Sequence, residues 1–447
     1  MKFILLALLT LFSILTFGQK KKSVSKPNIL VILVDDLGYH DVSYYGTKYI
    51  QTPNIDAICS SGMRFDNFYS NAPVCSPTRA SLLSGRYPER IGVPGLVRST
   101  PTDNFAFLKK GVLFIPQYLK AANYNSAIIG KWNLGLTSPN LPNEKGFDYF
   151  HGFLDDMMND YYTHLRNGNN FMRENKKVIN PVGHATDLFT QWAVDYIGAQ
   201  KNSSNPFFLY LAYNAPHSPV QPPAERLAKV TARENGIADN RANLVALIEH
   251  LDDGIGKVIQ SLKKSGKFEN TLIVFMSDNG GLVSNGSNNG DLRGTKTSMY
   301  EGGIRIPACI SWPKYIAPNS SNSDRVISMD IFPTIIDIVG IKNNSTIDGV
   351  SLLPLLTAKA VNNKPRNLFF TMRDGGIKMG GQTTQALISG DWKILQNTPF
   401  QPYELYNLQS DPFEQHNLAD IEVKKFQELQ KQMVQHIKIG GKVPWQQ

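Results

Sequence analysis

Continuous runs of apolar residues alternate with amphipathic segments along most of the chain. The apolar runs cover residues 27–34, 126–129, 207–213, 271–276 and 308–311. Runs of this length, rich in β-branched residues, predict strands buried on both faces. Between them, apolar residues recur every three or four positions from Leu244 to Leu262, which predicts a helix that stops at Gly266. This alternation predicts an α/β domain whose large, mostly parallel central sheet is flanked by helices.

The pattern changes after about residue 360. Shorter strand-like segments cover residues 367–372, 385–389, 392–396 and 404–407, and a helical pattern runs from about 420 to 439. We therefore expect a main domain over residues 27–360 and a smaller C-terminal subdomain over residues 361–447. The subdomain is predicted to hold an antiparallel sheet and a terminal helix.

The N-terminus has its own pattern. An apolar stretch from Phe3 to Phe17 follows Met1 and Lys2, and Gly18, Gln19 and three lysines come after it. This arrangement predicts a signal peptide over residues 1–18 and a linker over 19–26, and hence an exported protein, periplasmic or secreted. The stretch is too short to predict a stable membrane span, although an uncleaved N-terminal anchor is the alternative.

Charge and cysteine content narrow the possible classes of protein. The formal net charge is +9, so the surface attracts polyanions. No nucleic-acid-binding motif or basic tail is recognisable, and we expect no nucleic-acid partner. The three cysteines, Cys59, Cys75 and Cys309, are too few for a disulfide scaffold. We expect Cys59 and Cys309 to be two small buried apolar residues.

Two pairs of oxygen-bearing side chains follow two of the predicted strands. Asp35 and Asp36 come directly after the first strand, and Asp278 and Asn279 follow the strand at 271–276. Ligands of open α/β sheets bind outside the carboxyl ends of the strands, so we expect the two pairs to meet there. Either pair alone is more often a turn or a helix cap. Together, four hard oxygen ligands suit Ca²⁺, with Mg²⁺ as the second choice.

Cys75 begins the run C-S-P-T-R, which continues as A-S-L-L-S-G-R. Pro77 suits the first position of a helix and Gly85 suits the position just past its end. Cys75 is then expected at a helix N-terminus, where free N–H groups favour an anion. Arg79, four residues on, can reach the same anion.

Three further loops carry polar groups to the same edge of the predicted sheet. Lys131 lies in G-K-W-N-L-G after the strand at 126–129, and His217 lies in A-P-H-S-P after the strand at 207–213. Lys296 lies in G-T-K before the strand at 308–311. An isolated lysine is usually solvated and an isolated histidine usually structural. Their shared edge and their glycine- or proline-marked loops favour a common site here.

With these motifs the chain resembles the type I sulfatases of the alkaline-phosphatase superfamily, in particular arylsulfatases and N-acetylgalactosamine-6-sulfatase-like enzymes. The resemblance begins at about Pro27 and extends to Asn417 and Leu418. It implies an alkaline-phosphatase-like fold, and it implies that a formylglycine-generating maturation enzyme oxidises Cys75. The hydrated aldehyde would attack sulfur with one hydroxyl, and loss of the proton from the other would release sulfate.

The same resemblance implies a role for each matching residue. The metal ligands would be Asp35, Asp36, Asp278, Asn279 and an oxygen on residue 75. Arg79 and Lys131 would hold and activate the hydrated aldehyde, Lys296 would clamp a sulfate oxygen, and His217 would protonate the leaving group.

One position departs from the family pattern. The family segment is G-K-W-H-L-G, and this chain has Asn133 in place of the histidine. Asparagine can donate a hydrogen bond but cannot take up a proton near neutral pH. We expect Asn133 to contact the reacting group. We expect another base, either water or His217, to take up the proton in the second step, in which sulfate is released from residue 75.

The insertion at residues 151–166 supplies aromatic, acidic and basic side chains, and we expect His164 and Arg166 to contact a sugar. An ordinary polar surface loop is the alternative. The resemblance and the positive charge imply hydrolysis of sulfate esters on a sulfated polysaccharide or its oligosaccharides. Two alternatives stay open: a phosphodiester or phosphonate monoester hydrolase of the same superfamily, and a catalytically impaired protein that binds sulfated glycans.

Overall fold

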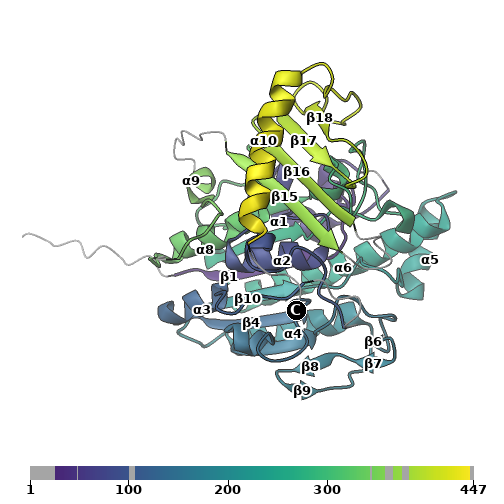
Figure 1. Cartoon of the computed structure of the whole chain (residues 1–447). Coiled ribbons are helices and arrows are strands. Elements are labelled where there is room, and N and C mark those ends of the chain that lie inside the picture. The colour runs from purple at the N-terminus through teal and green to yellow at the C-terminus, as the bar shows by residue number, and fades with distance from the viewer. Residues whose placement is uncertain are drawn as a thin grey trace, which may run out of the picture.

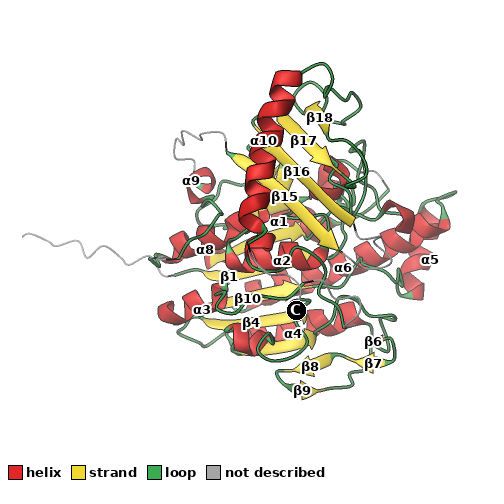
Figure 2. Ribbon diagram, in the orientation of Figure 1, coloured by secondary structure: helices red, strands yellow, loops and turns green. Residues whose placement is uncertain are grey.

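The computed structural model describes residues 26–47, 49–99, 106–342, 345–357, 366–374 and 382–442. A large mixed sheet with helices on both faces forms the main body, and a four-stranded sheet with the terminal helix forms a smaller body (Figures 1 and 2). The predicted signal peptide, most of the predicted linker and the predicted boundary near residue 360 lie outside the described residues. No helix of the described part is long and apolar enough to cross a membrane.

The helices are α1 Pro53–Ser60, α2 Cys75–Ser84, α3 Ile115–Leu119, α4 Ala185–Ala199, α5 Ala224–Arg233, α6 Asp239–Lys264, α7 Glu301–Ile304, α8 Ile331–Val339, α9 Leu353–Leu356 and α10 Val423–Gly440. The strands of the large sheet are β1 Asn28–Val34, β2 Met63–Phe65, β4 Asn125–Lys131, β5 Tyr149–Phe153, β8 Met172–Glu174, β9 Lys177–Val178, β10 Phe207–Ala212, β11 Thr271–Ser277, β12 Ala308–Ser311 and β13 Ser320–Asn322. The four-stranded sheet contains β15 Asn367–Asp374, β16 Gln382–Ser389, β17 Trp392–Gln396 and β18 Glu404–Asn407, and two short pairs are β3 Phe68–Tyr69 with β14 Val326–Ile327 and β6 Leu165–Arg166 with β7 Asn169–Asn170.

The large sheet has the order β13-β2-β12-β11-β1-β10-β4-β5-β8-β9. Its centre, β11-β1-β10-β4-β5, is parallel throughout, whereas β12 and β8 run antiparallel to their inner neighbours. All seven residues of β1 are buried, which explains why its sequence is apolar without alternation. The predicted α/β class and mostly parallel sheet are confirmed.

Side chains of β1 alternate between two hydrophobic cores. Ile29, Val31 and Leu33 pack into the core beneath α2, α3 and α8, while Leu30, Ile32 and Val34 pack into the core beneath α1, α4 and α6. Because both faces are covered, the polar groups at the carboxyl ends of the strands are left as the place where a ligand can bind.

The predicted antiparallel C-terminal sheet and terminal helix are also confirmed. One face of this sheet packs against α10 through residues such as Leu387 and Ile394. Its other face, which includes Phe370 and Leu395, shares a core with Val74 and Cys75. The smaller sheet therefore lies against the segment that carries Cys75.

The expectation for Cys59 and Cys309 was wrong, because the two residues form a disulfide. Cys59 lies near the end of α1 and Cys309 lies in β12, and α1 packs on β12 so that the two Cα atoms are 5.2 Å apart. They are 250 residues apart in sequence, so only the tertiary packing brings them within bonding distance. Cys75 is the free cysteine of the chain.

Candidate active site

The two carboxylate pairs meet at the carboxyl ends of adjacent strands. Asp35 and Asp36 follow β1, and Asp278 and Asn279 follow β11, its parallel neighbour. The Asp36 backbone N–H donates to Asp278 Oδ1 at 3.2 Å, and the Asn279 amide donates to Asp36 Oδ1 at 2.7 Å. All four side chains are buried. The strand order thus produces the cluster that the sequence predicts.

Cys75 is the first residue of α2, so its side chain lies at the helix N-terminus. The helix begins two residues earlier than Pro77 suggests, since proline is tolerated throughout the first turn, where backbone N–H groups have no helical partner. The helix ends at Gly85, whose φ of 69° is left-handed. The thiol donates to Asp35 Oδ1 at 3.3 Å, and Lys296 Nζ lies 3.7 Å from Sγ.

Burial and the nearby carboxylates of Asp278 and Asp35 raise the pKa of the Cys75 thiol well above its usual value. The unmodified side chain is therefore a protonated thiol at neutral pH, and a thiol is a poor nucleophile. This environment does not suit thiolate catalysis.

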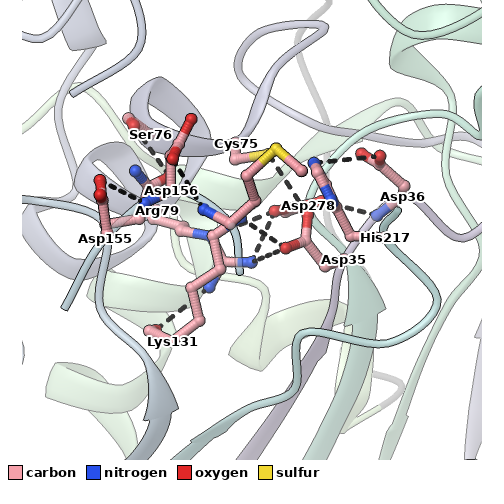
Figure 3. Close-up of polar contacts among 12 residues, drawn as sticks. Asp35, Asp36, Cys75, Ser76, Arg79, Lys131, Asp155, Asp156, His217 and Asp278 are labelled. Carbon is pink, nitrogen blue, oxygen red and sulfur yellow. Dashed lines mark hydrogen bonds and ion pairs between the residues drawn. The ribbon is translucent and has the colours of Figure 1, made fainter. Parts of the chain in front are cut away.

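Three buried cations, Arg79, Lys131 and Lys296, lie against the carboxylates, and Figure 3 labels the first two. The Arg79 guanidinium binds Asp278 at 2.7 Å, Lys131 Nζ binds Asp35 at 2.5 Å, and Lys296 Nζ binds Asp36 at 2.7 Å. Lys131 is the last residue of β4 rather than a loop residue.

These cations also set the charge of Asp35. Burial alone would raise the pKa of Asp35, but Lys131, His217 and Arg79 outweigh burial and hold it well below its usual range. The carboxylate is therefore ionised at neutral pH.

His217 approaches the cluster from the loop after β10. Its Nδ1 lies 2.7 Å from the Ser218 carbonyl oxygen, and because a carbonyl can only accept, Nδ1 carries the proton. Its Nε2 lies 3.6 Å from Asp36 Oδ2. Burial and the Lys296 charge lower the pKa of His217, so the neutral ring presents the Nε2 lone pair to the site.

The donor set fits a hard divalent cation. Ligand atoms of Asp35, Asp36, Cys75 and His217 all lie within 4.8 Å of one another. Asn279 Oδ1 is buried and has no hydrogen-bond partner among the described residues. A buried amide carbonyl oxygen without a hydrogen-bond partner, beside carboxylates, is a ligand type that Ca²⁺ and Mg²⁺ accept.

The sequence model of the family described as Sulfatase matches residues 27–341, about seven-tenths of the chain. The chain belongs to the sulfatase family. It is a sulfuric ester hydrolase, and its relatives and structural neighbours support activity on sulfated glycans. A second model, described as N-sulphoglucosamine sulphohydrolase, C-terminal, matches residues 294–440.

Individual relatives agree with the family assignment. The sulfatase is 32% identical to the N-acetylgalactosamine-6-sulfatase of Rattus norvegicus, over 87% of this chain and 74% of that protein. It is 34% identical to the Homo sapiens enzyme of the same name, over 76% of this chain and 67% of that protein. A solved structure described as Ps i-CgsB in complex with k-i-k-neocarrahexaose is 33% identical, with a TM-score of 0.82 and 92% coverage of both chains.

In this sulfatase, Asn133 is bonded on both sides of its side-chain amide. Its Nδ2 donates to the Val97 carbonyl at 2.9 Å, and its Oδ1 accepts from the Ser76 hydroxyl at 2.9 Å. Ser76 Oγ in turn accepts from the Val97 backbone N–H at 3.0 Å. The Asn133 backbone has a left-handed φ of 57°. These bonds connect the residue after Cys75 to the segment around Val97.

His164 and Arg166 lie in the insertion after β5, and they differ in burial. The His164 ring is buried, and its Nε2 bonds the Gly183 carbonyl at 2.9 Å. Arg166 is partly exposed, and its Nε lies 3.3 Å from Asp156 Oδ1. Neither residue contacts the carboxylate cluster directly.

The structure brings Asp374 of the small C-terminal sheet to Arg98, on the insertion side of the site. Arg98 binds both carboxylate oxygens of Asp374 from β15, at 3.1 and 3.0 Å, and lies 4.0 Å from Asp156. This group of charged residues has no sequence signature, because Arg98, Asp156 and Asp374 come from three separate segments of the chain. Asp155 and Asp156, which begin two residues after the end of β5, gave the one available sequence indication of this part of the site: a polar pair after a strand.

Proposed function

We propose that this sulfatase is exported and removes sulfate from a sulfated polysaccharide or its oligosaccharides after Cys75 is oxidised to formylglycine. The observation that carries the proposal is the position of Cys75, at the N-terminus of α2 between two carboxylate pairs and three buried cations. The chain's partners are then the sulfated carbohydrate and a formylglycine-generating maturation enzyme, with no nucleic acid.

Asp35, Asp36, Asp278, Asn279 and an oxygen on residue 75 would hold a divalent cation, Ca²⁺ first and Mg²⁺ second. The cation would neutralise and polarise the sulfate group. The unpartnered Asn279 Oδ1 supports this assignment, since the oxygen has no other partner among the described residues.

Hydrated formylglycine would supply one hydroxyl as the nucleophile and a second whose deprotonation releases sulfate and restores the aldehyde. Lys131 and Arg79 are placed to orient these hydroxyls, because both lie against Asp35, the carboxylate that accepts from the Cys75 thiol. Lys296, whose Nζ lies 3.7 Å from Sγ, is placed to bind a sulfate oxygen. These fixed cations favour charge that develops on the sulfuryl group in the transition state.

His217 is the group that we assign to proton transfer. Its neutral ring offers the Nε2 lone pair, which can take a proton from a hydroxyl, and the protonated ring can donate that proton to the leaving oxygen. Because the amide of Asn133 is bonded to Ser76 and Val97, it supplies no base, and the second step relies on His217 or water.

Two similarities and the net charge support a sulfated saccharide as the substrate. The chain is similar to an N-acetylgalactosamine-6-sulfatase and to a protein whose structure was solved in complex with k-i-k-neocarrahexaose, and its net charge of +9 favours a polyanionic substrate. We propose Arg166, partly exposed beside Asp156, as a sugar contact. His164 and Asn133 would shape the same pocket through the bonds they make to backbone and Ser76.

The test is sulfate release, measured by ion chromatography, from a panel of sulfated oligosaccharides. The protein is co-expressed with a formylglycine-generating enzyme, and peptide mass confirms conversion of Cys75. Release that is lost in Cys75→Ala and after chelation, and that returns with Ca²⁺, supports the proposal. With conversion confirmed, absence of release together with cleavage of a bis-aryl phosphate would establish a phosphodiesterase. Binding to the panel without any release would establish a glycan-binding protein.

A further inference from the structure

Asp155 is a buried carboxylate that has no role in the proposed reaction, although it lies close to the segment that carries Cys75. It lies two residues after β5, and the end of β5 is paired with the end of β4, where Phe153 lies beside Lys131. In the view of Figure 3, Asp155 and Asp156 lie on the same side of Cys75 as Ser76 and Arg79. Asp155 is therefore a buried neighbour of the site on its insertion side.

Hydrogen bonds within the protein satisfy only half of the Asp155 carboxylate. Its Oδ1 accepts from the Asp156 backbone N–H at 2.8 Å. Its Oδ2 is buried and has no hydrogen-bond partner among the described residues. Burial and the Asp156 charge raise the pKa of Asp155 to about 6.

The neighbouring charges are already paired with one another. Asp156 lies 3.3 Å from Arg166, and Arg98 binds Asp374 with two hydrogen bonds. Arg98 is held in place because Val97, which precedes it, bonds Ser76 next to the nucleophile. These paired charges therefore leave Oδ2 of Asp155 as a hydrogen-bond acceptor with no partner among the described residues.

Leaving a buried carboxylate oxygen without a partner costs stability, and such a cost is typical of functional sites. A sugar ring with its sulfate among Lys131, Lys296 and residue 75 would direct its other hydroxyl groups toward the insertion side of the site, where Asp155 lies. A hydroxyl group is the donor that an ionised carboxylate oxygen binds well.

We propose that Asp155 determines substrate specificity by accepting, at Oδ2, a hydrogen bond from a hydroxyl group of the sugar that carries the sulfate. This inference rests on the proposed function and adds a residue that recognises the sugar ring rather than the sulfate.

The experiment compares Asp155→Asn and Asp155→Ala with the wild type on two substrates. One is the oligosaccharide of the panel that the wild type desulfates fastest, and the other is 4-methylumbelliferyl sulfate, which has no sugar hydroxyl. We expect kcat/KM for the oligosaccharide to fall roughly 10- to 100-fold, the usual range for losing a hydrogen bond to a charged group. Turnover of the aryl sulfate should stay within about twofold of wild type, because the groups that bind sulfate are untouched.

Asp195→Asn, an exposed carboxylate on α4, is the matched control and should leave both substrates unchanged. The melting temperature of Asp155→Asn separates recognition from support of the fold: asparagine keeps an oxygen that accepts from the Asp156 backbone N–H, so this variant should not melt at a lower temperature. Equal loss on both substrates, a lowered melting temperature, or unchanged oligosaccharide turnover would overturn the role of Asp155. If the wild type released sulfate from no saccharide, both this inference and the proposed function would fail, whereas normal release by Asp155→Asn would overturn this inference alone.

Discussion

Replacing Asn133 tests the position where the chain departs from the family pattern G-K-W-H-L-G. The side-chain amide makes two hydrogen bonds, 2.9 Å to the Val97 carbonyl and 2.9 Å from the Ser76 hydroxyl, and the residue is fully buried. Its backbone has a φ of 57°, a region that asparagine and glycine adopt more readily than other residues. Asn133→Ala therefore removes two buried hydrogen bonds and places alanine in a strained conformation.

The magnitude follows from these two terms. A buried hydrogen bond contributes about 0.5–1.5 kcal/mol net, so the pair contributes about 1–3 kcal/mol. The left-handed conformation adds about 1 kcal/mol for alanine. We expect Asn133→Ala to lower the free energy of unfolding by about 2–4 kcal/mol.

Denaturant unfolding measures this loss, and Asn133→Gly is the matched control. Glycine also lacks the amide but tolerates the positive φ, so it should be about 1 kcal/mol more stable than the alanine variant. Both variants should keep Ca²⁺ binding, because Asn133 contacts none of the proposed ligands except through Ser76, which follows Cys75.

The reasoning would be refuted if Asn133→Ala lost less than about 0.5 kcal/mol, since two buried hydrogen bonds cannot then be present. Equal stability of the alanine and glycine variants would refute the conformational term alone.

Four further predictions concern the nucleophile, the proton path and the attachment of the C-terminal sheet. Cys75→Ser should give at most slow or single turnover, because a sulfated serine cannot expel sulfate by forming an aldehyde; sustained turnover in a sulfate-release assay would contradict the mechanism. Asn133→His should leave Ca²⁺ binding intact and alter the pH profile of kcat, and an unchanged profile would remove this position from the proton path. Lys393→Met should lower the free energy of unfolding by about 3–5 kcal/mol, because Lys393 forms buried ion pairs of 2.8 Å with two glutamates; a change below about 1 kcal/mol would count against the pairing. Glu89 is buried, but its bond to His436 outweighs burial and lowers its pKa, so its stabilisation is present above about pH 4.3, the ordinary glutamate pKa, and is lost as pH falls through the lower folded value. The melting temperature of Glu89→Gln should therefore fall less than that of wild type between about pH 5 and 3, and parallel curves would show that Glu89 does not contribute.

Local patterns in the sequence predicted the main elements closely. The predicted strand at 308–311 is β12 without change, and the strand at 126–129 gained one residue at its start and two at its end. The terminal helix expected at about 420–439 is α10, Val423–Gly440. These elements follow from hydrophobic periodicity and from glycine and proline positions, which act within a few residues of sequence.

The sequence alone also determined which residues gather at the active site. Carboxyl ends of parallel strands share one edge of a sheet, so Asp35, Asp278, Lys131 and His217 had to lie near one another once the strands were recognised. The motif at Cys75 required no knowledge of the sheet.

Only the tertiary structure decided which side chains bind each other. It paired Cys59 with Cys309, bonded the Asn133 amide to Ser76 and Val97, and brought Asp374 of the small sheet to Arg98. Among the residues that the structure describes, it also left Oδ2 of Asp155 without a hydrogen-bond partner. Such contacts join segments tens to hundreds of residues apart, and they depend on side-chain positions that no local pattern records. The sequence therefore determined the chemistry of this protein, and packing between distant segments determined the detailed geometry around it.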